Sequence, residues 1–325
     1  MNETNKLDVV QKNQNIHINR DDLEIDHSKA GNIRGSFITT WKTTAYNEEI
    51  TIPTNSGSGP YHYSVDWGDG SIDSDLSGDA THRYASPGIY TVTIRGVFPH
   101  IFFNGRSWAD KIRTVEQWGD IRWTSMERAF AGCSNLEILA TDAPDLSEVT
   151  DMSFMFESAT SFNQNIGSWD VSNVANMSGM FWYATSFNQN INDWDVSNAI
   201  NMSFMFNGAY AFNEDISGWD VSNATDMKWM FAFAISFNQD IGGWNVGKVT
   251  NMSFMFNGAY AFNQNIGDWD VNRVTNMEFM FHRAISFNQK IGNWDVSNVT
   301  DMNWMFSRSG LDFHQLFSDS GQMDK

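Results

Sequence analysis

The second half of the chain repeats itself with a fixed step of 25 residues. Met152 opens the first regular unit, and the equivalent methionine returns in every later unit up to Met302. A tryptophan keeps the same step from Trp169 to Trp294. Self-similarity of this period is typical of proteins in which each unit buries its apolar side against the next one. The chain is therefore expected to stack one unit on another from about residue 104 onward.

Each unit is predicted to contain one short helix. In the first regular unit Met152, Met155, Phe156 and Ala159 fall at i, i+3, i+4 and i+7, which is the spacing of one helical face. An Asp or Asn, here Asp151, stands just before each such run. Its side-chain oxygen would cap the free N–H groups at the start of a helix.

Each unit is also predicted to contain one short strand. Ile166, Trp169, Val171 and Val174 follow the pattern I-x-x-W-x-V-x-x-V, which is similar to the core of leucine-rich repeats. Alternation along the strand would point Trp169 and Val171 inward. We therefore expect an α/β solenoid of leucine-rich-repeat type, with a short parallel strand and a short helix in each 25-residue unit.

Residues 34–103 carry a different pattern, rich in β-forming residues and broken by turns such as "TNSGSGP". Here "VDWGDGS", followed by "THRYASPGIYTVTI", resembles the signature of PKD domains over about residues 60–96. The resemblance implies a small immunoglobulin-like β-sandwich ahead of the repeats. Asp66 and Asp69 lie in its acidic turn, where they either hold calcium or only shape and solubilise the turn.

The repeats themselves resemble those of BspA-like leucine-rich-repeat surface proteins of bacteria. Units that read much like "MFxxAxSFNQNIGxWDVSNVTNM" carry this resemblance over about residues 112–306. It implies an extracellular or cell-surface protein that adheres to host cells, matrix components or other bacteria. No apolar segment of a signal peptide is visible at the start of the sequence.

These patterns predict five parts. They are a flexible leader or linker (1–33), a PKD-like β-sandwich (34–103), N-terminal capping repeats (104–151), six regular repeats (152–301) and a C-terminal cap (302–325).

Composition narrows the range of partners. The formal net charge of −19 disfavours nucleic acid, whose phosphates need Lys and Arg, and equally disfavours an anionic membrane surface. No apolar run is long enough to span a membrane. Cys133 is the single cysteine, so no internal disulfide forms. A protein or a glycan on another cell or in the matrix is the expected partner, and self-association stays open.

One acidic residue recurs between the Trp and Val of each unit. If Trp and Val face inward, this residue faces outward and forms a column along the stack. Three interpretations are open: the column binds calcium, it presents an acidic stripe to a basic partner, or each Asp only bonds its own local turn. Its carboxylate members are Asp170, Asp195, Asp220, Asp270 and Asp295, and Asn245 takes the remaining place.

A second column consists of asparagines from the recurring "FN" of each unit. We expect their stacked amides to satisfy backbone groups in the turns. They are Asn163, Asn188, Asn213, Asn238, Asn263 and Asn288.

Aromatic residues vary from unit to unit on the side opposite the predicted strand. Exposed aromatic patches often mark binding sites, although packing between units would explain the same residues. The candidate ligand-binding residues are Trp182, Tyr183, Tyr210, Phe233 and Tyr260.

No catalytic motif is visible. The sequence has no nucleotide-binding loop, metalloprotease motif or nucleophile elbow, and its His residues show no metal-ligand spacing. We therefore expect a non-enzymatic, adhesin-like surface or secreted binding protein that recognises a protein or glycan through its repeats. The alternative is a structural spacer or assembly component of a surface layer, appendage or particle.

Overall fold

A computed structural model describes residues 35–311 of the protein. The predicted leader (1–33) and all but the first ten residues of the predicted C-terminal cap lie outside the described residues.

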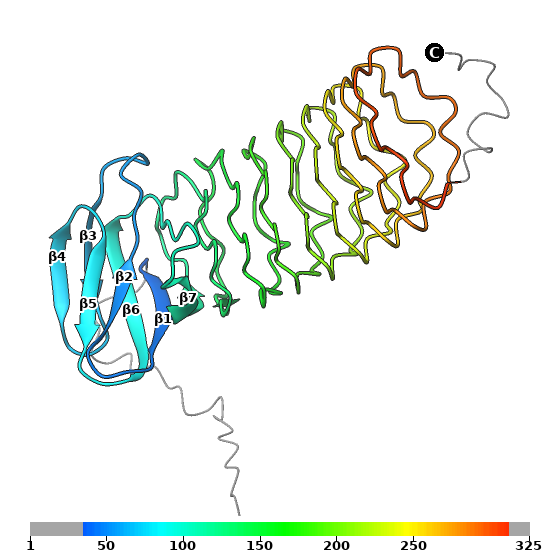
Figure 1. Ribbon diagram of the computed structural model, residues 1–325. Coiled ribbons are helices and arrows are strands. Elements are labelled where there is room, and N and C mark those ends of the chain that lie inside the picture. The colour runs from blue at the N-terminus through cyan, green and yellow to red at the C-terminus, as the bar shows by residue number, and fades with distance from the viewer. Residues whose placement is uncertain (1–34, 312–325) are drawn as a thin grey trace, which may run out of the picture. The chain divides into compact units, whose positions relative to one another are not determined.

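The first part of the described chain forms two sheets (Figure 1). The larger sheet has the strand order β4-β3-β6-β1-β7-β8, and β2 pairs with β5 in a second, two-stranded sheet. All pairs are antiparallel except β7 with β8, which are parallel. The strands are β1 (Phe37–Thr43), β2 (Glu48–Ile52), β3 (His62–Asp66), β4 (Ile72–Leu76), β5 (Ala80–Tyr84), β6 (Gly88–Val97), β7 (Ile112–Gln117) and β8 (Glu137–Ile138).

The two sheets share one hydrophobic core with the repeats. Ile52 from β2 and Tyr84 from β5 are buried together with Trp41 and Val92 of the larger sheet. Strands β7 and β8 continue that sheet past residue 103, into the segment predicted as capping repeats.

His100 connects the sheets to the first repeat. Its Nδ1 accepts a hydrogen bond from the Ser58 hydroxyl at 2.7 Å, and its Nε2–H donates to the Glu127 carbonyl at 2.7 Å. Burial lowers the pKa of His100 to about 4, so the ring is neutral at pH 7. A neutral ring with one donor and one acceptor fits both contacts.

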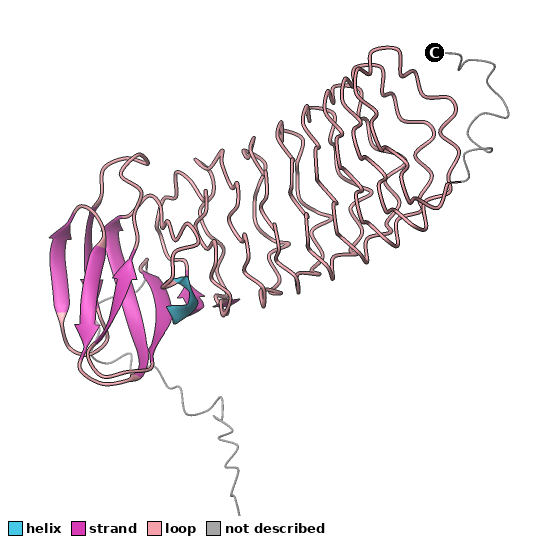
Figure 2. Ribbon diagram, in the orientation of Figure 1, coloured by secondary structure: helices cyan, strands magenta, loops and turns pink. Residues whose placement is uncertain are grey.

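The repeats contain no α-helix, so the prediction of an α/β solenoid of leucine-rich-repeat type is wrong. The single helical element among residues 35–311 is the short 3-10 helix η2 (Ala109–Lys111), which precedes the repeats (Figure 2). The predicted strand in each unit is also absent, because the segment around Trp169 and Val171 consists of turns and irregular chain. The regular structure of the described chain is confined almost entirely to its sheets.

Each 25-residue unit, called a coil below, runs from one of the recurring methionines to the next. Successive coils lie side by side in chain order (Figure 1). A single parallel bridge joins each coil to its neighbour, always at the Asp or Asn that precedes the methionine, from Asp151 through to Asp301. These residues were predicted to cap helices. Instead their side-chain oxygens accept the N–H two residues later, as Asp151 does from Ser153 at 2.8 Å.

The backbone after the methionine bonds to the next coil rather than to itself. In the coil that begins at Met202, Phe204 N–H donates to the Lys228 carbonyl at 2.9 Å and Phe206 N–H to the Met230 carbonyl at 2.9 Å. A helix would direct the Phe206 N–H to Met202, four residues back. The intervening N–H groups close tight turns within the coil, as Met205 does to Met202 at 3.3 Å.

Left-handed residues allow successive N–H groups to bond in turn to the next coil and within their own coil. Phe204 has φ 60° and Gly208 has φ 71°, and equivalent positions in the other coils are also left-handed. A non-glycine residue costs about 1–2 kcal/mol in this conformation, so the bonds between coils must offset it. The apolar spacing i, i+3, i+4, i+7 is therefore satisfied by successive tight turns, which bury Met202, Met205 and Phe206 as a helix would.

Aromatic columns run through the core of the stack. Phe206 stacks on Phe231 with ring centroids 5.6 Å apart, and Phe231 on Phe256 at 5.7 Å. The tryptophans stand beside them, and the Trp244 indole N–H donates to the Ile216 carbonyl of the preceding coil at 3.1 Å. Every coil thus places the same residue on the same residue of its neighbour.

The asparagine column is confirmed. Asn238 accepts the backbone N–H of Asn263 through its side-chain oxygen at 2.8 Å, and it also accepts the Gln264 side-chain amide at 3.0 Å. The same bond between backbone and amide links each successive pair from Asn163 to Asn288.

Replacing Asn238 by Ala is expected to lower the free energy of unfolding by about 1–2 kcal/mol, because two donors lose their acceptor. Urea denaturation of the purified protein measures the change. Asn238→Asp keeps the acceptor and is the control. If Asn238→Ala unfolds at the same urea concentration as the parent protein, the column adds nothing to stability.

Candidate binding face

One side of the stack carries a continuous row of aromatic rings, all half-buried except the exposed Trp304. We call it the aromatic row. Most of its members are the second residue after the recurring methionine, where the left-handed backbone turns the side chain outward. The row consists of Phe154, Trp182, Phe204, Trp229, Phe254, Phe279 and Trp304.

The rings of this row contact one another from coil to coil. Trp229 and Phe254 have centroids 4.1 Å apart with planes 9° apart, and Phe254 and Phe279 are 4.8 Å and 10° apart. Phe204 lies 5.9 Å from Trp229 on its other side, 8° from parallel. Stacking therefore covers the faces of the central rings, and their edges point to solvent.

Trp182 enters the row from a different position in its coil. Its coil has Gly179 where the others have an aromatic residue, and a Cβ at Gly179 would overlap the Phe154 ring. The Trp182 ring fills the gap, 5.8 Å from both Phe154 and Phe204. In this coil the aromatic ring comes from Trp182 and not from position 179, so the row continues without a gap.

Two more aromatic rings lie flat on glycines of the next coil. A Cβ at Gly208 would meet the Tyr183 ring at 2.7 Å, and one at Gly258 would meet the Phe233 ring at 2.7 Å. The identical segments "NMSFMFNGAYAFN" supply both glycines. In both units the glycine of this segment makes room for the aromatic ring of the coil before it.

All five predicted ligand-binding residues lie on this side of the stack. Tyr183, Tyr210 and Tyr260 are 39%, 41% and 40% exposed, whereas Trp182 and Phe233 are half-buried. Ile235 and Ile285 occupy the places equivalent to Tyr210 and Tyr260 in other coils and are 37% and 59% exposed. We call these residues and the aromatic row together the aromatic face.

Most of the aromatic row was missed from the sequence. Its signal was present, because an aromatic residue stands two places after the methionine at Phe154, Phe204, Trp229, Phe254 and Phe279. A helix would also turn this position away from its apolar face, but the prediction considered only the aromatic residues that vary from unit to unit.

Buried polar atoms lie beneath the aromatic face. Asn207 and Asn257 are only 4% and 6% exposed, and among residues 35–311 neither side-chain oxygen has a hydrogen-bond partner. The same holds for the indole N–H of Trp182. An unsatisfied buried polar group costs about 1–3 kcal/mol, so these positions lower the stability of the fold.

Charge on the aromatic face lies at its two ends and beside Phe204, where the Lys228 ammonium is 5.8 Å from the ring centroid and pairs with Asp226. At one end the Arg128 guanidinium lies 4.4 Å from the Phe154 ring centroid and pairs with Glu157 at 2.5 Å. At the other end Arg283 and Arg308 occupy adjacent coils, and among residues 35–311 neither has a carboxylate within ion-pairing distance. Burial, followed by the charges of Arg283 and Arg308, lowers the pKa of His282.

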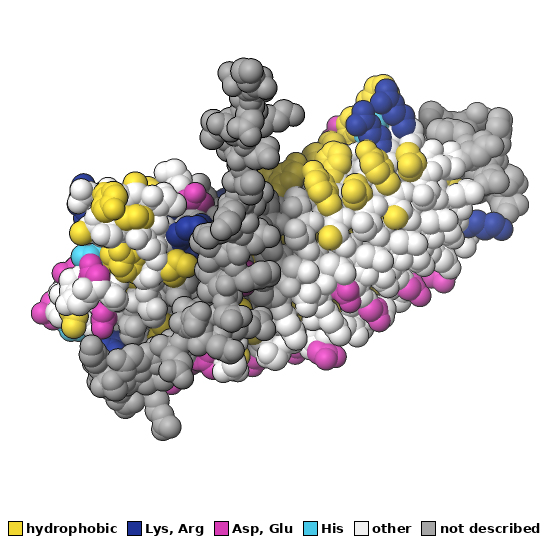
Figure 3. All heavy atoms as spheres, turned by 90° about the horizontal axis from the view of Figure 1, so that it is seen from below, with side chains coloured by type: hydrophobic (Ala, Val, Ile, Leu, Met, Phe, Trp, Pro, Cys, Tyr) yellow, Lys and Arg dark blue, Asp and Glu magenta, His cyan; other side chains and the backbone are white. Residues whose placement is uncertain are grey.

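The acidic column lies at a different edge of the stack. Figure 3 shows hydrophobic side chains gathered along one edge, with Lys and Arg at the end of their row, and acidic side chains along another edge. The column's predicted members Asp170, Asp195, Asp220, Asp270 and Asp295 are all exposed. Asp145, one coil earlier, was missed although it keeps the same step of 25 residues.

Each carboxylate of the column bonds its own turn. Asp170 accepts the N–H of Ser172 at 3.1 Å and its hydroxyl at 2.6 Å, and Asn245 makes the equivalent backbone bond to Gly247. Hydrogen bonds from the serine hydroxyl and then the serine N–H lower the pKa of five of the carboxylates. These are Asp145, Asp170, Asp195, Asp220 and Asp295.

Asp66 and Asp69 are also used locally, in the turn between β3 and β4. Asp66 accepts the Gly68 N–H at 3.0 Å, and Asp69 accepts the Ser71 N–H at 3.0 Å while facing His82 Nε2 at 2.8 Å. Within residues 35–311 no group of three or more His, Cys, Asp or Glu residues is placed to hold a metal ion. Calcium binding at these carboxylates stays a prediction.

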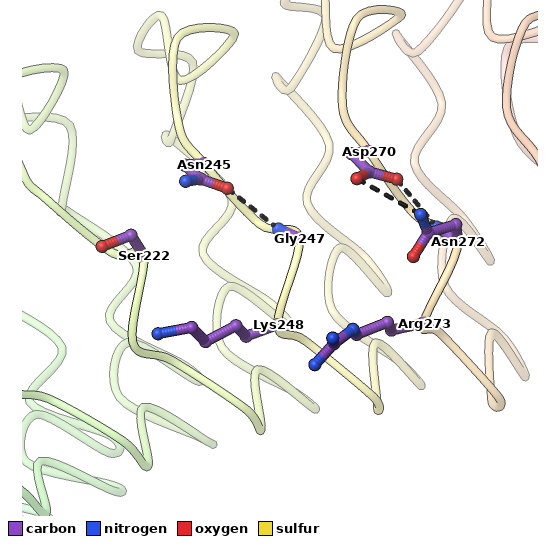
Figure 4. Close-up of a pocket in the computed structure, with 7 residues that line it drawn as sticks. All are labelled: Ser222, Asn245, Gly247, Lys248, Asp270, Asn272 and Arg273. Carbon is purple, nitrogen blue, oxygen red and sulfur yellow. Dashed lines mark hydrogen bonds between the residues drawn. The ribbon is translucent and has the colours of Figure 1, made fainter.

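A hollow of about 450 Å³ interrupts the acidic column (Figure 4). Asn245 and Asp270 line it together with Lys248 and Arg273 from the same two coils. The Lys248 ammonium donates to the Asn223 side-chain oxygen at 2.6 Å. The two basic residues thus place positive charge beside the column at the point where one carboxylate is replaced by an amide.

Two further features bear on function. Cys133 is fully buried, and burial raises the pKa of its thiol, so it is not a reactive nucleophile. The described part of the chain contains no helix with the length and apolar character needed to cross a membrane.

Comparison with known proteins gives a family and no function. A family model described as "Mycoplasma protein of unknown function, DUF285" matches residues 124–241 and 215–319. Searches of curated proteins and of solved structures each gave no match.

Gly208→Ala is expected to destabilise the protein by about 1–2 kcal/mol, because it puts a Cβ in left-handed backbone, and by more if the Tyr183 ring is also displaced. Thermal or urea unfolding measures the loss. Gly243→Ala is the control, since a Cβ there meets nothing within 4 Å. If the two variants are equally stable, the close contact between Gly208 and the Tyr183 ring does not contribute to stability.

Proposed function

We propose that this chain, which belongs to the DUF285 family, is a non-enzymatic binding protein that recognises a protein or glycan through its aromatic face. We further propose that it acts at a bacterial cell surface or after secretion. The proposed location rests on the resemblance of its repeats to BspA-like surface proteins and of residues 60–96 to PKD domains.

The aromatic face is the observation that carries the proposal. A chain of net charge −19 gathers rings and isoleucines along one edge of its stack, apart from the acidic column (Figure 3). Contiguous exposed apolar surface of this kind is typical of interaction sites. Removing it from water on binding would contribute about 25 cal/mol for each Å² buried.

The repetition of similar positions along the stack favours a long ligand that contacts several coils. Equivalent positions recur at each coil, so the face offers a series of similar contacts along the stack and not one deep cavity. A polymer that binds several coils at once would gain affinity from each of them without needing a pocket.

A spacer or assembly role is the second candidate. Like residues stack on like residues from coil to coil, as Phe206 does on Phe231 and Asn238 on Asn263, so a second molecule with the same coil could continue the stack. Concentration-dependent self-association, measured by analytical ultracentrifugation, would favour this role.

A binding screen tests the main proposal. The purified protein is tested against immobilised matrix proteins and glycans, once with calcium and once with EDTA. Saturable binding is expected, and the double variant Tyr210→Ser/Tyr260→Ser is expected to weaken it by about tenfold, since each ring contributes buried area.

Tyr46→Ser provides the matched control, because Tyr46 is 75% exposed and lies between β1 and β2, away from the coils. Binding that is lost only in EDTA would assign a cation to the acidic column or to the Asp66–Asp69 turn. Binding that the two tyrosine substitutions leave unchanged would refute the aromatic face as the site.

A further inference from the structure

We infer that the partner of the aromatic face is an extended polypeptide, with apolar side chains on the aromatic row and acidic residues against Arg283 and Arg308. This inference rests on the proposed function and specifies the class of ligand.

Ring geometry favours a polypeptide over a glycan. A sugar ring stacks on an open aromatic face, but neighbouring rings occupy both faces of Trp229 and of Phe254. Tyr183 and Phe233 each have one face against a glycine of the next coil. The surface presented to solvent therefore consists largely of ring edges, which pack well against branched aliphatic and aromatic side chains.

The repeat adds a second requirement. Equivalent side chains recur at each coil along the face, so a partner that contacts several of them must itself be extended. A polypeptide in extended conformation presents side chains at regular intervals along its length.

Charge sets the third requirement, because it determines which end of the partner lies at which end of the aromatic face. Arg283 and Arg308 stand in the coils that also carry Phe279 and Trp304. The described residues offer neither arginine an acidic partner, and the Glu157 carboxylate at the far end of the face is already paired with Arg128. An acidic group at one end of the partner would meet two guanidinium groups, which hold carboxylates well.

The test uses two synthetic peptides that share a segment of alternating Leu and Ser. One ends in Glu-Glu and the other in Lys-Lys. Fluorescence polarisation is expected to show saturable binding of the acidic peptide, weaker binding at high salt, and about tenfold lower affinity for the basic peptide.

Charge reversal locates the contact. Arg283→Glu/Arg308→Glu is expected to exchange the preference, so that the basic peptide becomes the tighter ligand. Lys248→Glu/Arg273→Glu is the matched control. It changes the net charge by the same amount, also in two adjacent coils, but at the hollow in the acidic column.

The outcomes separate this inference from the proposed function. Glycan binding that requires Tyr210 and Tyr260, with no binding of either peptide, would overturn the inference and leave the proposed function standing. An acidic peptide that binds equally well to the Arg283→Glu/Arg308→Glu variant would also overturn the inference. Failure of every peptide, glycan and matrix protein to bind would overturn both.

Discussion

Backbone hydrogen bonds between successive coils are the constraint on which the rest of the structure depends. Alternate N–H groups after each recurring methionine donate to the next coil, as Phe204 does to Lys228 and Phe206 to Met230. These bonds fix the register between neighbouring coils at the methionine, and they are kept even where Met126 and Met152 stand 26 residues apart, as Arg128 N–H donates to the Ser153 carbonyl at 2.8 Å. The same bonds place like side chains on like side chains, which produces the phenylalanine and asparagine columns.

This arrangement also creates the aromatic face. A left-handed residue two places after the methionine is needed for the alternating bonds, and it turns its side chain toward solvent. Aromatic residues at that position then meet their equivalents one coil away and cover each other's faces. Where Gly179 leaves a gap, Trp182 fills it, and Gly208 and Gly258 make room for Tyr183 and Phe233. A regular backbone thus supports a surface whose composition differs from coil to coil.

Much of the organisation could be predicted from the sequence. The step of 25 residues, the inward direction of Trp169 and Val171, the outward direction of Asp170 and the bonding of the asparagine column all follow from the repeat. The helix could not be excluded in the same way, because Met152, Met155, Phe156 and Ala159 are buried equally well by tight turns. Only the left-handed backbone at residues such as Phe154 separates the two structures, and a phenylalanine gives no sign of it.

The candidate site was also predicted only in part. Tyr183, Tyr210 and Tyr260 differ between units and were found by that variation. Phe154 and Phe204 occupy a recurring position and were not among the predicted ligand-binding residues. The burial of the Asn207 and Asn257 oxygens, and the absence of a carboxylate beside Arg283 and Arg308 within residues 35–311, depend on long-range packing, which no local pattern reveals.

Far-ultraviolet circular dichroism of the purified protein tests the central claim most directly. Coils held by bonds to their neighbours, with no helix in any described repeat, predict a spectrum without a helical component. A strong helical signal that disappears in one step with unfolding would contradict the account, because it would place a helix in each unit.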